Sequence, residues 1–397
     1  MQTPVYLDYN ATTPVAERAL KRMRPYLGEH FGNPSSSGHA FGWMAEEAVE
    51  LAREEVAALL GVNVDDAADA LAFTSGATEA LNLALKGAMD AYRQKGRHLV
   101  TCQTEHKAVL DTCRFLENQG ADVTYLPVDA QGRLAPDRFA DALTDETVLA
   151  CVMRANNETG VLQPIRRLAA IAREAGVLFL TDATQAVGKL PVEAAEADLA
   201  AEADLLVASA HKFYGPKGAG VLYRSRRQPR VRLSPLIHGG GQEGGLRGGT
   251  LNTPALAGMG AAAALAQERL AEDAERLRRL RDDFEDHLRA ELSDVRVNGA
   301  GAERLPQTSS VTFGGVRAEK LESELRALAV STGSACSTGA REPSHVLKAM
   351  GLTDGEARAT LRFSLGRPTT AEEVQFAAER TVDAVRKRRG SEPPVAA

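Results

Sequence analysis

Short apolar runs alternate with stretches of helical periodicity from about residue 17 to residue 223, and this alternation constrains the fold more than any other feature of the sequence. The runs are residues 70–73, 99–102, 123–126, 148–152, 177–181, 203–208 and 220–223. Their length and apolar character are typical of strands that are buried on both faces. Strands that alternate with helices form a mostly parallel sheet with helices on both faces. We therefore expect an α/β fold whose large domain, residues 15–260, contains a seven-stranded sheet.

A smaller domain is expected to follow this sheet. Residues 254–292 form a long, charged, amphipathic pattern that predicts one helix linking two domains. Beyond residue 294 the pattern becomes strand (309–313), helix (319–328), loop, helix (343–350), strand (360–365) and helix, which indicates an α+β domain made of residues 1–14 and 261–397. Its last helix, residues 370–388, opens with Thr370 and Glu373, a capping box. We expect residues 390–397 to be a disordered tail.

Composition and charge exclude several classes of protein. The net charge of −6 gives no reason to expect direct binding of nucleic acid or of an anionic membrane. The basic residues 386–389 end a predicted helix, where cations favourably meet the helix dipole, so we interpret them as structural. Residues 255–266 are too short to span a bilayer, and no charged-then-apolar leader opens the chain. The four cysteines have no metal-site spacing, so we expect no metal and a reducing, cytoplasmic location.

Polar side chains follow two of the predicted strands. Lys212 comes shortly after the run 203–208, with glycines closing the turn behind it, and Asp182 comes directly after the run 177–181. In open α/β sheets, ligands bind at this edge. A partly desolvated lysine can form a Schiff base, and an aspartate can keep the ring nitrogen of pyridoxal 5'-phosphate (PLP) protonated. Taken alone, Lys212 would more often be a solvated surface lysine, but the second strand end argues for one shared site.

Other segments supply groups that suit the same cofactor. Residues 74–79 turn from a strand into a helix start, whose free N–H groups and positive dipole suit a phosphate, although this signal is weak by itself because any strand-to-helix turn shows it. His106 and Asn157 each follow a predicted strand. The imidazole of His106 could stack on the face of the PLP ring, and the amide of Asn157 could lie near the phenolic oxygen of PLP. A lone histidine, however, is more often a packed or surface residue. The glycine-rich residues 238–250 must form a loop, which is either an interdomain linker or a means of bringing Thr250 to a phosphate, in a neighbouring subunit.

Cys336 differs from the other cysteines in its surroundings. It lies in a segment of small residues, 331–339, with no apolar period, so we expect a mobile, accessible loop over about residues 331–341. Cys102, Cys113 and Cys151 lie in or near apolar segments and are expected to be buried and inert. A thiol on an accessible loop can travel, and its thiolate form would be a competent nucleophile.

Taken together, these residues resemble the PLP-dependent cysteine desulfurases of the NifS/IscS-like group, in the class V aminotransferase family, over nearly the whole chain. The matching segments are residues 6–14, 31–36, 73–79, 104–106, 156–158, 182–185, 209–218, 334–336 and 362–367. The resemblance implies PLP-dependent fold type I, a homodimer, and an active site at the subunit boundary.

The resemblance also implies a role for each matching residue. Lys212 would be the Schiff-base lysine, His106 the stacking, acid-base imidazole, and Asp182 the partner of the ring nitrogen. Gln185 and Asn157 would address the polar edge of the ring. The phosphate would be held by Ala77, Thr78, Ser209 and His211, with Thr250 arriving from the partner subunit. The substrate site would consist of Asn157, Asn33 and Arg362, whose planar guanidinium suits a carboxylate.

The implied reaction converts L-cysteine to L-alanine. Lys212 would remove the α-proton, Cys336 would attack the sulfur, and the resulting persulfide would pass to an acceptor such as an iron-sulfur scaffold or a tRNA-thiolation protein. Gly244 and Gly248 stand where arginine and serine are common in the family, so the partner-subunit part of the phosphate site is expected to lack a contact. The chain lacks the longer apolar tail of housekeeping members, which leaves the acceptor open.

Two alternatives remain at this point. The first is another fold type I enzyme that acts on amino acids, such as an aminotransferase or a selenocysteine lyase, which would use Lys212 and Asp182 without needing Cys336. The second is a non-catalytic protein that has kept the fold and the cofactor. Release of sulfur that depends on Cys336 distinguishes a desulfurase from both.

Overall fold

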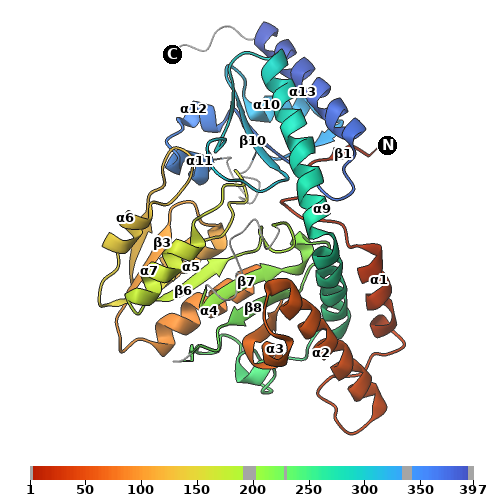
Figure 1. Cartoon of the computed structure of the whole chain (residues 1–397), viewed down its shortest axis with the longest axis vertical. Coiled ribbons are helices and arrows are strands. Elements are labelled where there is room, and N and C mark those ends of the chain that lie inside the picture. The colour runs from red at the N-terminus through yellow and green to blue at the C-terminus, as the bar shows by residue number, and fades with distance from the viewer. Residues whose placement is uncertain (1–2, 191–202, 228–229, 333–341, 392–397) are drawn as a thin grey trace.

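A seven-stranded sheet forms the centre of the lower half of the molecule in Figure 1. The computed structural model describes residues 3–190, 203–227, 230–332 and 342–391. The strands are β2 (Leu71–Thr74), β3 (His98–Cys102), β4 (Asp122–Leu126), β5 (Thr147–Cys151), β6 (Leu178–Asp182), β7 (Leu205–Ser209) and β8 (Gly220–Arg224). Their order is β2-β8-β7-β6-β5-β3-β4, and only β8 runs antiparallel to its neighbours. The predicted mostly parallel sheet is therefore confirmed, with each apolar run at its expected place.

Helices cover both faces of this sheet. The helices of this part of the chain are α1 (Glu17–Met23), α2 (Ala40–Leu60), α3 (Ala67–Ala70), α4 (Ala77–Ala91), α5 (Lys107–Glu117), α6 (Pro136–Asp141) and α7 (Ile165–Glu174), with short 3₁₀ turns η1 (Arg24–Leu27) and η2 (Val64–Asp66). Side chains alternate between the faces, so that Leu206 and Ala208 of β7 belong to one apolar cluster, and Leu205 and Val207 to another. Burial on both faces explains why the strands read as continuous apolar runs.

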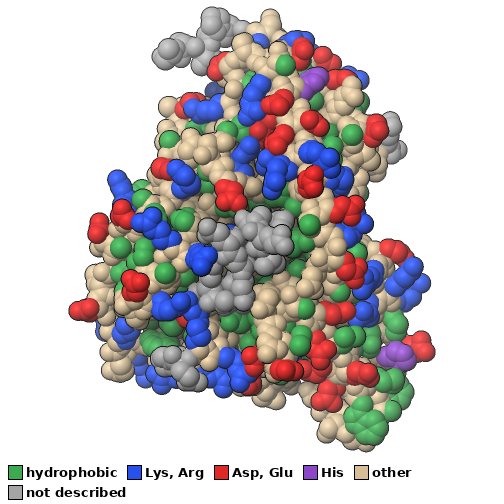
Figure 2. Space-filling model, viewed as in Figure 1, with side chains coloured by type: hydrophobic (Ala, Val, Ile, Leu, Met, Phe, Trp, Pro, Cys, Tyr) green, Lys and Arg blue, Asp and Glu red, His purple; other side chains and the backbone are tan. Residues whose placement is uncertain are grey.

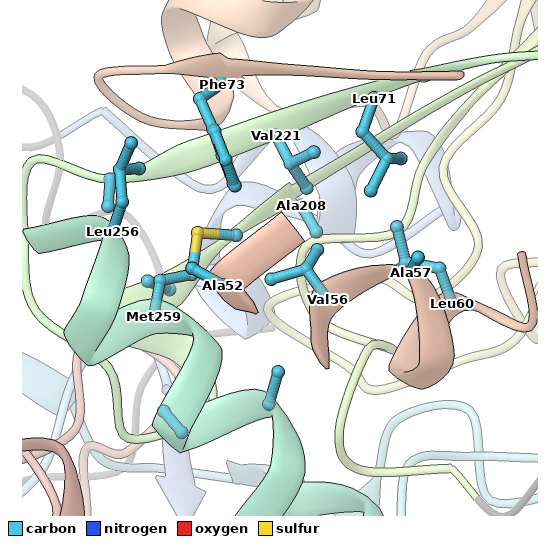
Figure 3. Packing of buried hydrophobic residues seen from close by; sticks show 14 of the residues in the cluster. Ala52, Val56, Ala57, Leu60, Leu71, Phe73, Ala208, Val221, Leu256 and Met259 are labelled. Atoms are coloured by element: carbon cyan, nitrogen blue, oxygen red, sulfur yellow. The ribbon is translucent and has the colours of Figure 1, made fainter. Parts of the chain in front are cut away.

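The helix α9 (Thr253–Glu291) runs for 39 residues and joins the lower and upper halves of the molecule (Figure 1). It confirms the predicted linking helix, and Asn252 caps its start by accepting a hydrogen bond from the N–H of Ala255. Figure 3 shows Leu256 and Met259 of α9 packed with α2 against Phe73 of β2. At Gly260 a Cβ atom would lie 2.6 Å from the Cα of Ala52, so this glycine allows the close approach of α9 to α2.

The upper half of the molecule contains two small sheets. One has the order β12-β10-β9 and is antiparallel, and in the other β1 pairs in parallel with β11. The elements are β1 (Val5–Tyr6), β9 (Val295–Val297), β10 (Thr308–Phe313), α10 (Ala318–Glu324), β11 (Leu328–Ala329), α11 (His345–Ala349), α12 (Asp354–Ala357), β12 (Thr360–Ser364) and α13 (Ala371–Ser391). The capping box is confirmed, because Thr370 and Glu373 exchange side-chain to backbone hydrogen bonds.

The boundaries of two predicted elements differ from the structure. The helix expected over residues 319–328 ends at Glu324, because the chain leaves helical geometry at Leu325 and returns as β11 beside β1. The helix expected from residue 343 begins at His345, where Ser344 caps it. The short elements β9 and α12 were not predicted from the sequence, since three or four residues carry too little periodicity.

The basic residues at the end of α13 make structural contacts, as expected from the sequence. Arg386, Lys387 and Arg389, however, have partners outside α13, whereas the sequence suggested the dipole of that helix itself. Arg386 pairs with Glu291, and Lys387 with Glu324. Arg389 donates to the backbone oxygens of Ser293 and Asp294, and not to the last carbonyls of its own helix. On the face drawn in Figure 2, Lys and Arg side chains are interspersed with Asp and Glu. Within the described ranges, no helix has the length and apolarity needed to cross a membrane.

Candidate active site

One cavity of about 490 Å³ lies at the carboxyl ends of the strands of the large sheet. It brings together most of the site residues expected from the sequence, namely Ala77, Thr78, His106, Asn157, Asp182, Gln185, Ser209, His211, Lys212 and Arg362. A volume of this size is typical of a small-molecule site. The alternation of strands and helices creates this arrangement, because parallel strands end at a common edge.

Lys212 is held at the wall of this cavity by the backbone of the N-terminal segment. It ends the single 3₁₀ turn η3 (Ala210–Lys212) that follows β7. Its Nζ atom donates to the backbone oxygens of Asn10, at 2.6 Å, and Ala11, at 2.8 Å. Gly215 allows the chain to turn back behind it, since a Cβ there would lie 2.8 Å from the Cβ of Ala210. The amine is therefore fixed by rigid backbone groups.

Asp182 is the last residue of β6 and is buried, with 6% of its surface exposed. Its Oδ1 atom accepts a hydrogen bond of 2.9 Å from the N–H of Thr184, which fixes the orientation of the carboxylate. β6 and β7 are parallel neighbours, and Asp182 lies opposite Val207, two residues before Ser209. The two adjacent strands therefore deliver the carboxylate and the amine of Lys212 to one cavity.

His106 caps the N-terminus of α5, and this contact sets the role of each ring nitrogen. Its Nδ1 atom accepts a hydrogen bond of 3.1 Å from the N–H of Ala108. In the neutral ring the proton must then lie on Nε2, which makes that atom a donor. Burial lowers the pKa of His106, and the charge of Lys212 lowers it further against the opposite effect of Asp182. The neutral ring is therefore the favoured form at neutral pH.

The N-terminus of α4 opens into the cavity without a side-chain cap. Its first residues are Ala77 and Thr78, and the preceding Gly76 has a φ of 153°, a value that side-chain-bearing residues rarely adopt. A Cβ at Gly76 would lie 3.8 Å from the Oγ of Ser209, so the end of β7 borders the helix start. Free N–H groups and a hydroxyl at one helix start form an anion site.

His211 borders the same anion site and is kept neutral by its surroundings. Burial lowers its pKa to about 4, and the positive charges of Lys212, Lys217 and Lys189 contribute to this shift. Its Nδ1 atom lies 3.1 Å from the Oγ1 atom of Thr12. The lysines near this ring create a positive potential that favours an anion at this position, because a bound anion would balance their charge.

Arg362 reaches the cavity from β12 of the upper sheet. One Nη atom donates to the backbone oxygen of Asn157 at 2.9 Å, and the other pairs with Asp8 at 2.6 Å. Its Nε atom is buried and has no hydrogen-bond partner among the described residues. A buried guanidinium with an unsatisfied N–H at a cavity wall suits a carboxylate ligand.

Asn10 and Lys189 contact expected site residues but were not themselves expected from the sequence. The backbone oxygen of Asn10 accepts from both Lys212 and Gln185, the latter at 2.9 Å. Lys189 donates to the Oε1 atom of Gln185 at 2.8 Å, and burial lowers its pKa well below the usual value. Asn10 lies in the matching segment 6–14, which was the available signal. Lys189 follows the segment 182–185 by one helical turn, and nothing in its sequence context marks it.

Three expected residues are not among those that line the cavity. Asn33 is exposed, and its Oδ1 atom accepts a hydrogen bond from the N–H of Ser35 in its own turn. Thr250 is also exposed in this single chain. Cys336 lies outside the described residues, as do residues 392–397 of the expected tail. The tail was predicted to begin at residue 390, but residues 390 and 391 are the last two of helix α13. The roles of Asn33, Thr250 and Cys336 in binding and catalysis therefore remain predictions.

The comparisons with known proteins agree with this geometry. The family model described as aminotransferase class-V matches residues 5–376. The protein described as cysteine desulfurase IscS from Anaeromyxobacter sp. (strain Fw109-5) is 51% identical over 393 residues, which cover 99% of this chain and 95% of that protein. A solved structure described as a NifS-like protein has a TM-score of 0.87 and 35% identity, covering 97% of this chain and 100% of its own.

A second solved structure, described as SspA in complex with cysteine, has a TM-score of 0.76 and 38% identity. It covers 91% of this chain and 98% of its own. The similarity to these proteins extends over the large sheet, the linking helix and the upper half of the molecule. This chain belongs to the class V aminotransferase family and, within it, to the cysteine desulfurases.

Proposed function

We propose that this cysteine desulfurase takes the sulfur of L-cysteine, releases L-alanine, and passes the sulfur to an acceptor protein from a persulfide on Cys336. The observation that carries this proposal is the single cavity that joins Lys212, Asp182 and Arg362. An amine, a buried carboxylate and a guanidinium around one volume match the needs of an aldehyde cofactor and an amino acid substrate. One solved relative was described in complex with cysteine, which supports the choice of substrate.

The residues around the cavity fit PLP. The uncapped start of α4 with Ser209 and His211 suits its phosphate, and Asp182 suits its ring nitrogen. A second buried polar atom also supports the fit, because the Oγ1 atom of Thr184 borders the cavity and has no partner among the described residues. His106 would hold the face of the ring, and Gln185 and Asn157 its polar edge. We propose that Thr250 of a second subunit completes the phosphate site.

When bound, PLP would accept the electron pair that remains on the α-carbon of the substrate after a proton leaves. Lys212 would bind the aldehyde end of the cofactor and move the α-proton, since its Nζ atom is held at the cavity wall. His106 would donate from Nε2, because its Nδ1 atom is occupied by the N–H of Ala108. Asp182 would stabilise a positive charge on the ring nitrogen.

Arg362 would orient the substrate through its carboxylate. Its pair with Asp8 fixes one Nη atom, so the unsatisfied Nε atom offers an N–H to the ligand. We propose that Asn33 joins this site only in the complete assembly, since in the single chain it is exposed. The substrate C–S bond breaks as a sulfur–sulfur bond forms with the Cys336 thiol. L-cysteine and a thiol then yield L-alanine and a persulfide, so the reaction needs no external oxidant.

We include a homodimer in the proposal. Large exposed hydrophobic side chains occur before and within the first half of α2, including Leu27 and Phe31, each 70% exposed, and Trp43, 55% exposed. Hydrophobic side chains also gather at the lower right of Figure 2. Exposed apolar clusters of this kind mark protein contacts. We also propose an iron-sulfur scaffold as the acceptor and a cytoplasmic location, where Cys102, Cys113 and Cys151 stay free thiols, as they are in the structure.

Replacing the proposed nucleophile tests this function. We expect Cys336→Ser to bind PLP and to exchange the α-proton of L-cysteine with solvent, but to form no persulfide and no catalytic amount of alanine. Ser337→Ala, a change at the neighbouring residue, serves as the matched control and should retain alanine production. Undiminished alanine production by Cys336→Ser would reject the persulfide role and favour a selenocysteine lyase or another fold type I enzyme.

A further inference from the structure

The described residues on either side of the segment that contains Cys336 are held by hydrogen bonds to segments next to the cavity. On its N-terminal side, Ser331 pairs with Arg362 in an antiparallel bridge, with backbone hydrogen bonds of 2.7 and 3.2 Å. Cys336 follows Ser331 by five residues, a tether of at most about 18 Å when fully extended. The described start of this stretch, Ser331, is held by Arg362, the residue that would bind the substrate carboxylate.

On the C-terminal side, Ser344 makes the corresponding contact. Its Oγ atom donates a hydrogen bond of 2.5 Å to the Oε2 atom of Glu158, and both residues are buried, at 3% and 5% exposed. The next residue, His345, contacts the backbone oxygen of Glu105 through Nε2 at 2.9 Å. Because a carbonyl oxygen can only accept, this nitrogen carries the proton. Glu158 and Glu105 are the sequence neighbours of Asn157 and His106 respectively.

Glu158 is presented by a rigid turn. The Oδ1 atom of Asn156 accepts hydrogen bonds from the N–H groups of Glu158, at 2.9 Å, and Thr159, at 3.0 Å. The Nδ2 atom of Asn156 donates to the backbone oxygen of Thr104 at 3.0 Å, which joins this turn to the segment that carries His106. The carboxylate that holds Ser344 is therefore fixed relative to the proposed cofactor site.

We propose that Ser344 is a positioning residue for sulfur transfer, because its hydrogen bond to Glu158 fixes the chain eight residues after Cys336 relative to Asn157 and His106. The inference rests on the proposed role of Cys336. Ser344 also caps α11, since its Oγ atom accepts from the N–H of Leu347 at 3.2 Å. If Ser344 were only structural, its role would be to cap α11. The test must therefore separate loss of this cap from loss of the hydrogen bond to Glu158.

Thr353 offers the matched control. It caps α12 in the same part of the chain, where the N–H of Glu356 donates to its Oγ1 atom. This capping box is exposed, and among the described residues none of its hydrogen-bond or ion-pair partners lines the cavity. Ser344→Ala and Thr353→Ala each remove one capping hydroxyl. Only Ser344→Ala also removes a link to Glu158. Ser344→Thr keeps the hydroxyl and serves as the conservative variant.

Two readouts on the PLP-loaded enzyme separate the roles. The first is the single-turnover rate of persulfide formation on Cys336 with L-cysteine, followed by mass spectrometry. The second is exchange of the α-proton of L-alanine with deuterated solvent, which needs Lys212 but no sulfur transfer. We expect Ser344→Ala to slow persulfide formation about 10- to 100-fold, as an error of about 1 Å in positioning does. Its alanine exchange should stay within about twofold of wild type.

The remaining variants complete the test. Thr353→Ala and Ser344→Thr should keep both rates within about twofold of wild type. Glu158→Ala should match Ser344→Ala, and the double variant should be no slower than either single variant, because both remove the same contact. If Ser344→Ala does not fold, Glu158→Ala and Ser344→Thr carry the comparison.

Two results would overturn the proposal. The first is a Ser344→Ala enzyme that is slowed no more than Thr353→Ala, and the second is a loss of alanine exchange equal to the loss of persulfide formation. A wild-type enzyme that exchanges the α-proton of alanine yet forms no persulfide has a different meaning. That outcome would remove the proposed function itself, and it is visible without any Ser344 variant.

Discussion

His106 combines a structural and a chemical contact in one side chain. Its Nδ1 atom caps α5, and its ring borders the cavity. Asparagine is among the best helix N-cap residues but has no imidazole ring. Alanine provides neither the cap nor the ring. Substitutions at this one position can therefore separate the stability of α5 from the chemistry of the site.

We predict that His106→Ala lowers the free energy of unfolding by about 1 kcal/mol, whereas His106→Asn changes it little, because asparagine keeps the cap. Both variants should lose about 100- to 10,000-fold in kcat, the usual contribution of an acid-base group. Thermal denaturation and steady-state alanine production measure the two effects. Full activity of His106→Asn would show that the ring plays no part in the reaction.

His211 predicts a pH dependence for the cofactor-free protein. Burial lowers its pKa to about 4 from 6.5, so the unfolded chain binds the proton first as the pH falls. The stability from the neutral ring is complete above pH 6.5 and is lost progressively as the pH falls toward about 4. In His211→Gln, which cannot titrate, stability should fall less steeply over this range. An equal or steeper slope in denaturation measured across this range would contradict the assignment.

At the scale of elements, the loop at residues 238–250 is fastened to the sheet by a buried ion pair. This loop contains the 3₁₀ turn η4 (Glu243–Gly245). Glu243 pairs with Arg53 of α2 at 2.8 Å, with side chains that are 1% and 6% exposed, and it accepts a hydrogen bond of 2.6 Å from the N–H of Phe73. A loop fixed in this way is not a flexible linker. The structure therefore does not support the interpretation of residues 238–250 as an interdomain linker.

We predict that Glu243→Ala lowers the free energy of unfolding by about 3–5 kcal/mol, because the buried guanidinium of Arg53 loses its buried carboxylate partner and keeps only the longer pair with the half-exposed Glu50. Asp137→Ala is the control, since its ion pair with Arg167 is exposed, and it should cost at most about 1 kcal/mol. Chemical denaturation measures both values. Equal, small losses in the two variants would show that the loop is not held by this pair.

The elements also show what the sequence could predict. Long strands and helices such as β5 and α9 were predicted because burial imposes a pattern over many residues. Lys212 and Asp182 were predicted because polar side chains end apolar runs. The contacts of Lys212 with the carbonyl oxygens of Asn10 and Ala11 were not predicted, because every residue has a backbone carbonyl and the residue type does not show which one accepts a hydrogen bond. The pair Arg53–Glu243 joins positions far apart in sequence, which no local pattern reveals.

At the scale of the whole molecule, the apolar core supports two domains. One cluster joins Leu256 and Met259 of α9 with the large sheet, and another joins Leu277 and Phe284 of α9 with Leu7 and the upper sheet. We propose the boundaries expected from the sequence, residues 15–260 for the large domain and residues 1–14 with 261–397 for the small one. The chain passes from the small-domain core to the large one after Leu7, and it returns within the single helix α9.

The proposed dimer makes a prediction about Thr250. If Thr250 serves the partner's phosphate site, Thr250→Ala should weaken PLP binding about tenfold or more, the value of one hydrogen bond to a charged group. Mixing this variant with the inactive Lys212→Ala should restore activity at limiting PLP, because each mixed dimer contains one site with both residues intact. Sedimentation and activity after refolding the mixture measure this. No recovery would place Thr250 in the site of its own subunit or outside any site.

The proposed reaction depends most on Lys212 being the amine that binds the cofactor aldehyde opposite Asp182. Borohydride reduction of the PLP-loaded protein fixes the cofactor on that amine, and peptide mapping by mass spectrometry then identifies the residue. We predict the label on Lys212 in the wild-type protein and weaker retention of the cofactor in Asp182→Ala. A label on Lys189 or Lys217, or no label on any lysine of a protein that has been saturated with PLP, would contradict the account.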